Sequence, residues 1–178
     1  MKPILKLLTI ALLIGACSEK EVIEEKIIIE PKFEAAVATL NPVGDSDVSG
    51  VVRFGQRDEG VRVLAEISGL SPGKHGFHIH KYGDCTAVDG TSAGGHFNPT
   101  GKEHSSPDAM NRHMGDMGNI EANANGVAQI DYIDKSLQVS MLVGRGVIVH
   151  GGEDDLSSQP SGAAGPRVGC GVVGIANE

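Results

Sequence analysis

The chain has 178 residues, which is the length of one domain or slightly more. Its hydrophobic fraction of 40% and charged fraction of 21% are typical of a globular protein and exclude a wholly disordered chain. Aromatic residues make up only 3% and the formal net charge is -8, so binding to nucleic acid is not expected. The 25 glycines have no Gly-X-Y period and predict many turns.

The first 16 residues have the pattern of an export signal. Lys2 and Lys6 precede an apolar run that is too short for a bilayer, which requires about 20 apolar residues. The run ends in Leu-Ile-Gly-Ala-Cys, which resembles a bacterial lipobox and makes Cys17 the expected lipidated residue. A plain secretory signal with an incidental cysteine is the alternative. We therefore predict a lipoprotein signal peptide at 1–16 and a membrane anchor at Cys17.

Residues 17–32 are predicted to be the lipid anchor and a tether. After Cys17 they mix charged residues with isoleucine and contain Pro31. The apolar run at 27–29 leaves an extra helix or an edge strand open as the alternative. The folded domain is expected over residues 33–178. The predicted location is the bacterial cell envelope, with the domain facing the periplasm or the outside.

From residue 33 onward, short β-type segments alternate with Gly, Pro, Asn and Asp. No stretch keeps the 3.6-residue apolar period of a helix, so an all-β sandwich or barrel is predicted. Two segments without a strand pattern, 81–117 and 151–169, are expected to be long loops, and loops of this length are usually functional. The expected strands are residues 33–40, 48–56, 60–68, 76–80, 118–122, 126–132, 147–150 and 171–175.

Histidines are concentrated in and around the first of these loops. His78 and His80 end a strand pattern and project from one face about 7 Å apart, which is near enough for one metal ion to take both. Neutral imidazoles suit copper and zinc, and three imidazoles with one carboxylate make a reasonable zinc site. Chance placement in a hydrophilic segment is the alternative that spacing leaves open. The further candidate ligands are His96, His104, His113, Asp116 and His150.

Five motifs occur in order along the chain. They are Gly-Phe-His-Ile-His at 76–80, Ser-Ala-Gly-Gly-His-Phe-Asn-Pro at 92–99, Arg-His-Met-Gly-Asp-Met-Gly-Asn at 112–119, Gly-Arg-Gly-Val-Ile-Val-His at 144–150 and Gly-Pro-Arg-Val-Gly-Cys-Gly-Val-Val-Gly-Ile-Ala at 165–176. Together they resemble the copper/zinc superoxide dismutases, over residues 33–176. The resemblance implies a Greek-key β-sandwich or flattened barrel of about eight antiparallel strands with two long functional loops.

The resemblance also implies a copper site and a zinc site that share one histidine. The implied copper ligands are His78, His80, His96 and His150, and the implied zinc ligands are His96, His104, His113 and Asp116. The implied reaction converts superoxide to dioxygen and hydrogen peroxide while copper alternates between its +2 and +1 states. His96 is then expected to leave reduced copper, take a proton and pass it on to the forming peroxide.

Further roles follow from the same resemblance. Arg167 is expected to guide the superoxide anion, where plain solvation of a loop arginine is the alternative. Asp154 is expected to hydrogen-bond histidines of both metal sites. Cys85 and Cys170 are expected to form a disulfide, with two reduced buried cysteines as the alternative. His75 is not an implied ligand and is predicted to be a structural histidine bonded to the backbone.

The sequence leaves three points open. A non-catalytic copper- or zinc-binding or metal-delivery lipoprotein on the same fold is the alternative function, although such relatives tend to lack ligands or the guiding arginine. The second loop contains acids but no lysine, so attraction of the anion is expected to rest on Arg167, copper and a base such as Lys102 or Arg112. Members of the family occur as dimers and as monomers, and a homodimer is among the states open to this chain.

Overall fold

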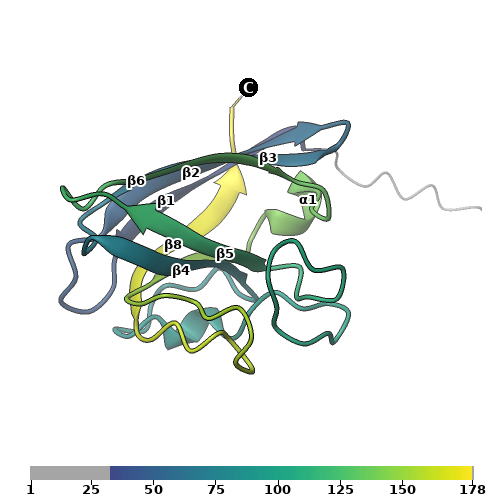
Figure 1. Cartoon of the computed structure of the whole chain (residues 1–178). Coiled ribbons are helices and arrows are strands. Elements are labelled where there is room, and N and C mark those ends of the chain that lie inside the picture. The colour runs from purple at the N-terminus through teal and green to yellow at the C-terminus, as the bar shows by residue number, and fades with distance from the viewer. Residues whose placement is uncertain (1–32, 178) are drawn as a thin grey trace, which may run out of the picture. The chain divides into compact units, whose positions relative to one another are not determined.

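The computed structural model describes residues 33–177, and the expected signal peptide, Cys17 and tether lie outside this part. Eight antiparallel strands close into one barrel in the order β1-β2-β3-β6-β5-β4-β7-β8 (Figure 1). The strands are β1 (Ala35–Pro42), β2 (Ser49–Arg57), β3 (Gly60–Ser68), β4 (Gly73–His80), β5 (Asp116–Ala122), β6 (Ala128–Asp134), β7 (Gly146–His150) and β8 (Arg167–Ile175). The connections from β3 to β4 and from β6 to β7 join strands that are not neighbours, which confirms the Greek-key prediction.

Alternating side chains fill the interior of the barrel. In β3 the apolar side chains at Val61, Val63, Ala65 and Ile67 are buried, and the residues between them are exposed. β4 differs, because every residue from His75 to His80 is buried. A strand that is buried on both faces must be covered on its outer face as well. Phe77 and Ile79 pack in the main core, so the alternating residues His78 and His80 project from the outer face of β4.

Two long loops supply this cover. The first loop, residues 81–115, connects β4 to β5 and contains the 3-10 turn η1 (Thr91–Ala93). The second loop, residues 151–166, connects β7 to β8. Figure 1 shows both loops gathered on one side of the barrel, next to β4. Loops of this length carry many backbone polar groups that strands do not satisfy, so side chains must fix them in place.

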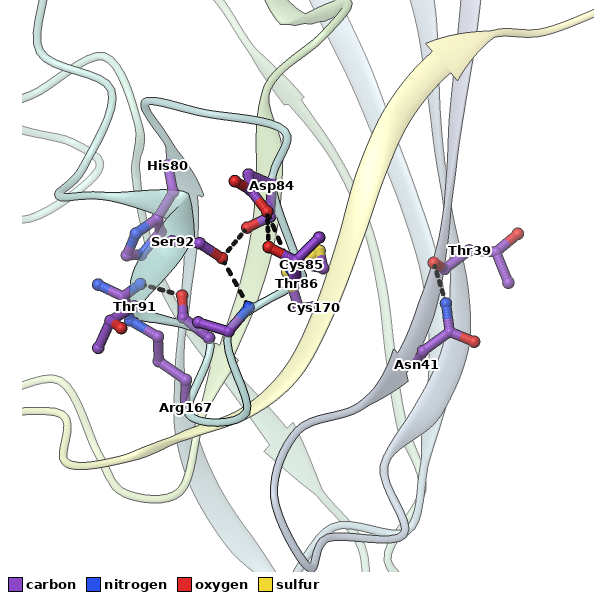
Figure 2. Close-up of a disulfide and its surroundings, with 12 residues drawn as sticks. Thr39, Asn41, His80, Asp84, Cys85, Thr86, Thr91, Ser92, Arg167 and Cys170 are labelled. Carbon is purple, nitrogen blue, oxygen red and sulfur yellow. Dashed lines mark hydrogen bonds between the residues drawn. A yellow bond between two sulfur atoms is a disulfide. The ribbon is translucent and has the colours of Figure 1, made fainter.

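The disulfide between Cys85 and Cys170 ties the first loop to β8, with the two Cα atoms 5.8 Å apart (Figure 2). Cys85 packs against a small buried cluster that lies apart from the main core. This cluster consists of Val43, Ala93, Ile148 and Cys170. The expected disulfide is confirmed, and it fixes the base of the loop that brings His96 toward β4.

β3 has the predicted bounds, whereas the other strands differ from the sequence prediction by one to three residues at one or both ends, and β8 differs more. β8 begins at Arg167 rather than at residue 171, because Arg167 pairs with His150 across a register shift in β7. A one-turn helix, α1 (Val139–Leu142), was not predicted, since four residues are too few to display a helical period. Within residues 33–177, no helix is both long and apolar enough to cross a membrane.

Candidate metal centre

Four buried histidines converge on the outer face of β4. His78 and His80 come from β4, His150 ends β7, and His96 is brought from the first loop by a bridge to His80. One ring nitrogen from each lies within 4.8 Å of the others. Four of these nitrogens are buried without a hydrogen-bond partner: His78 Nδ1, His80 Nε2, His96 Nε2 and His150 Nε2. Leaving a buried polar atom unpaired costs about 1–3 kcal/mol, so four together fit a bound metal ion.

The opposite nitrogen of three of these rings is fixed by an acceptor. His80 Nδ1 donates to the carbonyl oxygen of Gly94 at 2.8 Å, and His150 Nδ1 donates to the carbonyl oxygen of Gly165 at 3.1 Å. His78 Nε2 donates to Oδ2 of Asp154 at 2.8 Å. A neutral imidazole has one N–H and one lone pair. The unpartnered nitrogens therefore carry the lone pairs, as metal ligation requires.

A second cluster surrounds one carboxylate oxygen. Oδ1 of Asp116 lies 2.7 Å from His96 Nδ1, 3.0 Å from His104 Nδ1 and 3.1 Å from His113 Nδ1. The other oxygen of Asp116 accepts backbone N–H bonds from Ser105 and His113 at 3.1 and 2.9 Å, which fixes the carboxylate. Imidazole nitrogens and carboxylate oxygens are typical zinc ligands, and one such atom from each of His96, His104, His113 and Asp116 lies within 4.8 Å of the others. The donor set and its convergence therefore fit zinc.

His96 belongs to both clusters, because its Nδ1 faces Asp116 while its Nε2 faces the other histidines. Burial lowers the pKa of His96 to about 4, although the hydrogen bond to Asp116 acts in the opposite direction. Burial, with a contribution from His78, lowers the pKa of His150 to about 3. It also lowers the pKa of His80. These rings are therefore neutral at neutral pH, the form that binds metals.

Asp154 connects the two clusters. Its Oδ2 accepts from His78 Nε2 at 2.8 Å, and its Oδ1 accepts from His104 Nε2 at 2.9 Å. Burial acts to raise the pKa of Asp154, but hydrogen bonds from His78, from the backbone N–H of Leu156 and from His104 lower it. Its neighbour Asp155 is exposed and accepts bonds from Ser157 and Ser158 instead. The carboxylate between the clusters is therefore that of Asp154.

Arg167 lies beside the four-histidine cluster. Its Nη2 donates to the carbonyl oxygen of Gly94 at 2.6 Å, and its Nη1 donates to the carbonyl oxygen of Gly90. Figure 2 shows Arg167 and His80 together beside the loop that carries Cys85. A guanidinium has five N–H groups, so three remain for an anion.

Arg112 and Lys102, the other candidate bases for anion attraction, have different surroundings. Arg112 is buried, donates to the carbonyl oxygens of His113 and Asp116 at 2.9 and 3.0 Å, and forms an ion pair with Asp134 at 2.8 Å. Arg112 therefore stabilises the backbone of residues 113–116 from the protein interior, and its guanidinium does not face solvent. The ammonium of Lys102 donates to the carbonyl oxygen of Met110 at 2.8 Å.

Three further side chains support the residues of the two clusters through backbone atoms. His75 bonds the backbone, as predicted, with Nδ1 donating to the carbonyl oxygen of His150 at 2.8 Å. Asn119 was missed: its side chain donates to the carbonyl oxygen of Asp154 and accepts from the Asp154 N–H, both at 2.8 Å. Gln159 was missed as well and makes a similar pair of bonds to the backbone of His104. Asn119 is the last residue of the motif at 112–119, but the sequence did not show its partner or that of Gln159, because these partners are 35 and 55 residues away.

Comparison with known proteins agrees with this geometry. Residues 48–173 match the family model described as copper/zinc superoxide dismutase (SODC). "Superoxide dismutase [Cu-Zn]" of Onchocerca volvulus is 46% identical over 155 residues, which cover 79% of this chain and 95% of that protein. The crystal structure of the clock protein EA4 aligns with a TM-score of 0.76 and 36% identity, covering 84% of this chain and 99% of that one. This chain therefore belongs to the copper/zinc superoxide dismutase family.

Proposed function

We propose that this superoxide dismutase performs its reaction at the two clusters that share His96. The proposed copper ligands are His78, His80, His96 and His150, and the proposed zinc ligands are His96, His104, His113 and Asp116. The observation that carries the proposal is the set of four unpartnered buried imidazole nitrogens beside a carboxylate-centred trio of Nδ1 atoms. Bound copper supplies one-electron chemistry between its +2 and +1 states, and bound zinc supplies a fixed positive charge.

Two side chains act directly on the substrate in this proposal. Arg167 attracts the superoxide anion and orients it with the N–H groups that Gly90 and Gly94 do not use. His96 holds a proton on Nε2 when that atom is not ligating, and releases it to the forming peroxide. The ring of His96 would be kept in place by zinc bound at its opposite nitrogen, with Asp116 as a neighbouring ligand. Two superoxide anions and two protons give one dioxygen and one hydrogen peroxide.

The presence of the complete ligand set together with Arg167 favours an enzyme over a non-catalytic metal carrier. The test uses the full chain, loaded with copper and zinc after the bound metals are removed. We expect one copper and one zinc per chain. His80→Ala should lose copper and keep zinc, whereas His113→Ala should lose zinc and keep copper. Retention of both metals by both variants would contradict the assignment.

The proposal for the cellular location rests on the N-terminal sequence, which precedes the described residues. The lipobox-like pattern before Cys17 supports removal of residues 1–16, acylation of Cys17 and a tether through residue 32. The disulfide between Cys85 and Cys170 is typical of an exported protein. The enzyme would then protect the bacterial cell envelope, facing the periplasm or the outside. Labelling of cells with a fatty acid should mark the wild-type protein and leave Cys17→Ser unmarked.

A further inference from the structure

His104 is held in the first loop without help from a strand. Among the other residues of the two clusters, His78, His80, Asp116 and His150 lie in strands, and His96 bridges to His80. His113 is fixed by a backbone bond from the N–H of Asp116 to its carbonyl oxygen, at 3.3 Å. His104 has no backbone–backbone hydrogen bond to any of the described residues. Its backbone therefore depends on side chains.

Gln159 of the second loop supplies both missing bonds. Its Oε1 accepts the N–H of His104 at 2.9 Å, and its Nε2 donates to the carbonyl oxygen of His104 at 2.9 Å. One side-chain amide thus pairs with His104 as a neighbouring strand would. The backbone that precedes Gln159 is also held in place. Oδ1 of Asp155 accepts the N–H groups of Ser157 and Ser158 at 2.9 and 2.7 Å.

The imidazole of His104 has two partners of its own. Nδ1 lies 3.0 Å from Oδ1 of Asp116, and Nε2 donates to Oδ1 of Asp154 at 2.9 Å. The bond to Asp154 sets the plane of the ring, but it does not fix the position of the His104 Cα. Outer partners of metal ligands typically change metal affinity by about 10-fold to 100-fold when they are removed. The backbone pair from Gln159 is the contact that completes the positioning of this ligand.

We propose that Gln159 is a positioning residue for zinc: it clamps the backbone of His104 and thereby slows the loss of zinc from the site. This inference rests on the proposed role of His104 as a zinc ligand. It makes the second loop a part of the zinc site although no residue between 151 and 166 contacts the ion in the proposed ligand set. Gln159 is exposed, so its replacement does not open the core.

The test compares the loaded full-length wild type with Gln159→Ala, Gln159→Glu and the control Gln129→Ala. Gln129 is also an exposed glutamine with one side-chain hydrogen bond, to Glu66 at 2.7 Å on the outside of the barrel. Zinc transfer to a chelator is followed over time, and the visible spectrum is recorded with cobalt(II) in place of zinc. Gln159→Ala should lose zinc about 10-fold to 100-fold faster, keep its copper and show an altered cobalt spectrum. The rate of zinc loss from Gln159→Glu should lie between those of the wild type and Gln159→Ala, because glutamate keeps the acceptor and loses the donor.

Two results would overturn the inference. One is zinc loss from Gln159→Ala at the wild-type rate with an unchanged cobalt spectrum. The other is an equal acceleration in Gln129→Ala, which would indicate a general loss of stability. If the alanine variant does not fold, the same comparison is made with Gln159→Glu. A wrong assignment of His104 as a zinc ligand would be recognised separately, because His104→Ala would then retain zinc as the wild type does.

Discussion

His80 and Arg167 donate hydrogen bonds to one acceptor, the carbonyl oxygen of Gly94, over 2.8 and 2.6 Å. Gly94 ends η1 and has a φ of +71°, and a Cβ there would lie 2.9 Å from the ring of Tyr82. A residue with a side chain would therefore be strained at this position. One backbone oxygen thus sets the position of the proposed copper ligand relative to the proposed anion guide.

Replacement of Arg167 tests its proposed role in attracting and orienting the superoxide anion. Arg167→Ala should lower the second-order rate of superoxide decay at least about tenfold, because charge steering contributes 10-fold or more to such rates. Arg167→Lys should recover part of the rate, since it keeps the charge but loses the two-pronged contact with Gly90 and Gly94. The copper content of both variants should equal that of the wild type.

The matched control is Arg62→Ala, which removes the same charge from an exposed ion pair with Asp131 on the barrel. Exposed pairs of this kind contribute little to stability. The rates are compared at low ionic strength, where steering is strongest. An Arg167→Ala rate equal to that of the control would contradict the role of a guide.

Removal of the disulfide should affect both stability and activity. The bond between Cys85 and Cys170 closes a segment with a sequence separation of 85. The chain-entropy model gives about 4–5 kcal/mol for a loop of this size. The double variant Cys85→Ala/Cys170→Ala should therefore melt about 10 °C or more below the wild type. It should also be less active per bound copper, because the freed loop carries Gly94. A melting temperature within a few degrees of the wild type would contradict this account.

Gly162 makes room for Asp154. A Cβ at Gly162 would lie 1.7 Å from Oδ1 of Asp154, and the residue has a φ of +70°. Gly101 has a similar φ of +64° with no atom within 4 Å of a Cβ, so it is a matched control. Gly101→Ala should cost about 1–2 kcal/mol of stability from the backbone alone. Gly162→Ala should cost more and should also weaken metal retention, because the carboxylate is displaced from His78 and His104.

The measurements for this pair are the free energy of unfolding and the metal content after dialysis. Equal losses of stability in the two glycine variants, with full metal retention in both, would show that the space beside Asp154 has no role.

The sequence indicated the strands, the ligands and the contacts of Asp154 with both clusters, but not the side chains that hold the backbone of these residues. The alternation at 60–68 predicted β3, and the histidine motifs predicted residues that the structure brings together. The supporting groups Arg112, Asn119 and Gln159 act on backbone atoms of the metal-centre residues, and such contacts leave no periodicity in the chain. Gly165 and Pro166 predict a loop at Arg167, whereas pairing with β7 extends β8 to this residue.

The metal-free protein should lose stability when the pH falls below about 6.5. The pKa of His96 is about 4 and that of His150 about 3 in the folded chain, whereas an unfolded histidine has a pKa of about 6.5. The unfolded state therefore binds more protons in this range, and the stability that is present above pH 6.5 is lost on acidification. For His96 alone the loss is about 2 kcal/mol at pH 5.

Asp116 and Asp154 do not offset this loss. Hydrogen bonds lower the pKa of both carboxyls despite their burial, so their contributions persist until the pH falls below about 4. Thermal unfolding of the metal-free full chain at pH 7.5, 6 and 5 measures the effect. A melting temperature that does not change across this range would contradict the buried, neutral state of the histidines.

The most direct test of the central claim is the decay of superoxide in the presence of the copper- and zinc-loaded full chain. The rate should increase in proportion to the bound copper, and two superoxide anions should give one hydrogen peroxide. The same rate should vanish in His150→Ala, which loses the Nε2 atom that faces the other three histidines. Decay no faster than the uncatalysed reaction by the loaded wild type, or full activity in the copper-free protein, would contradict the account.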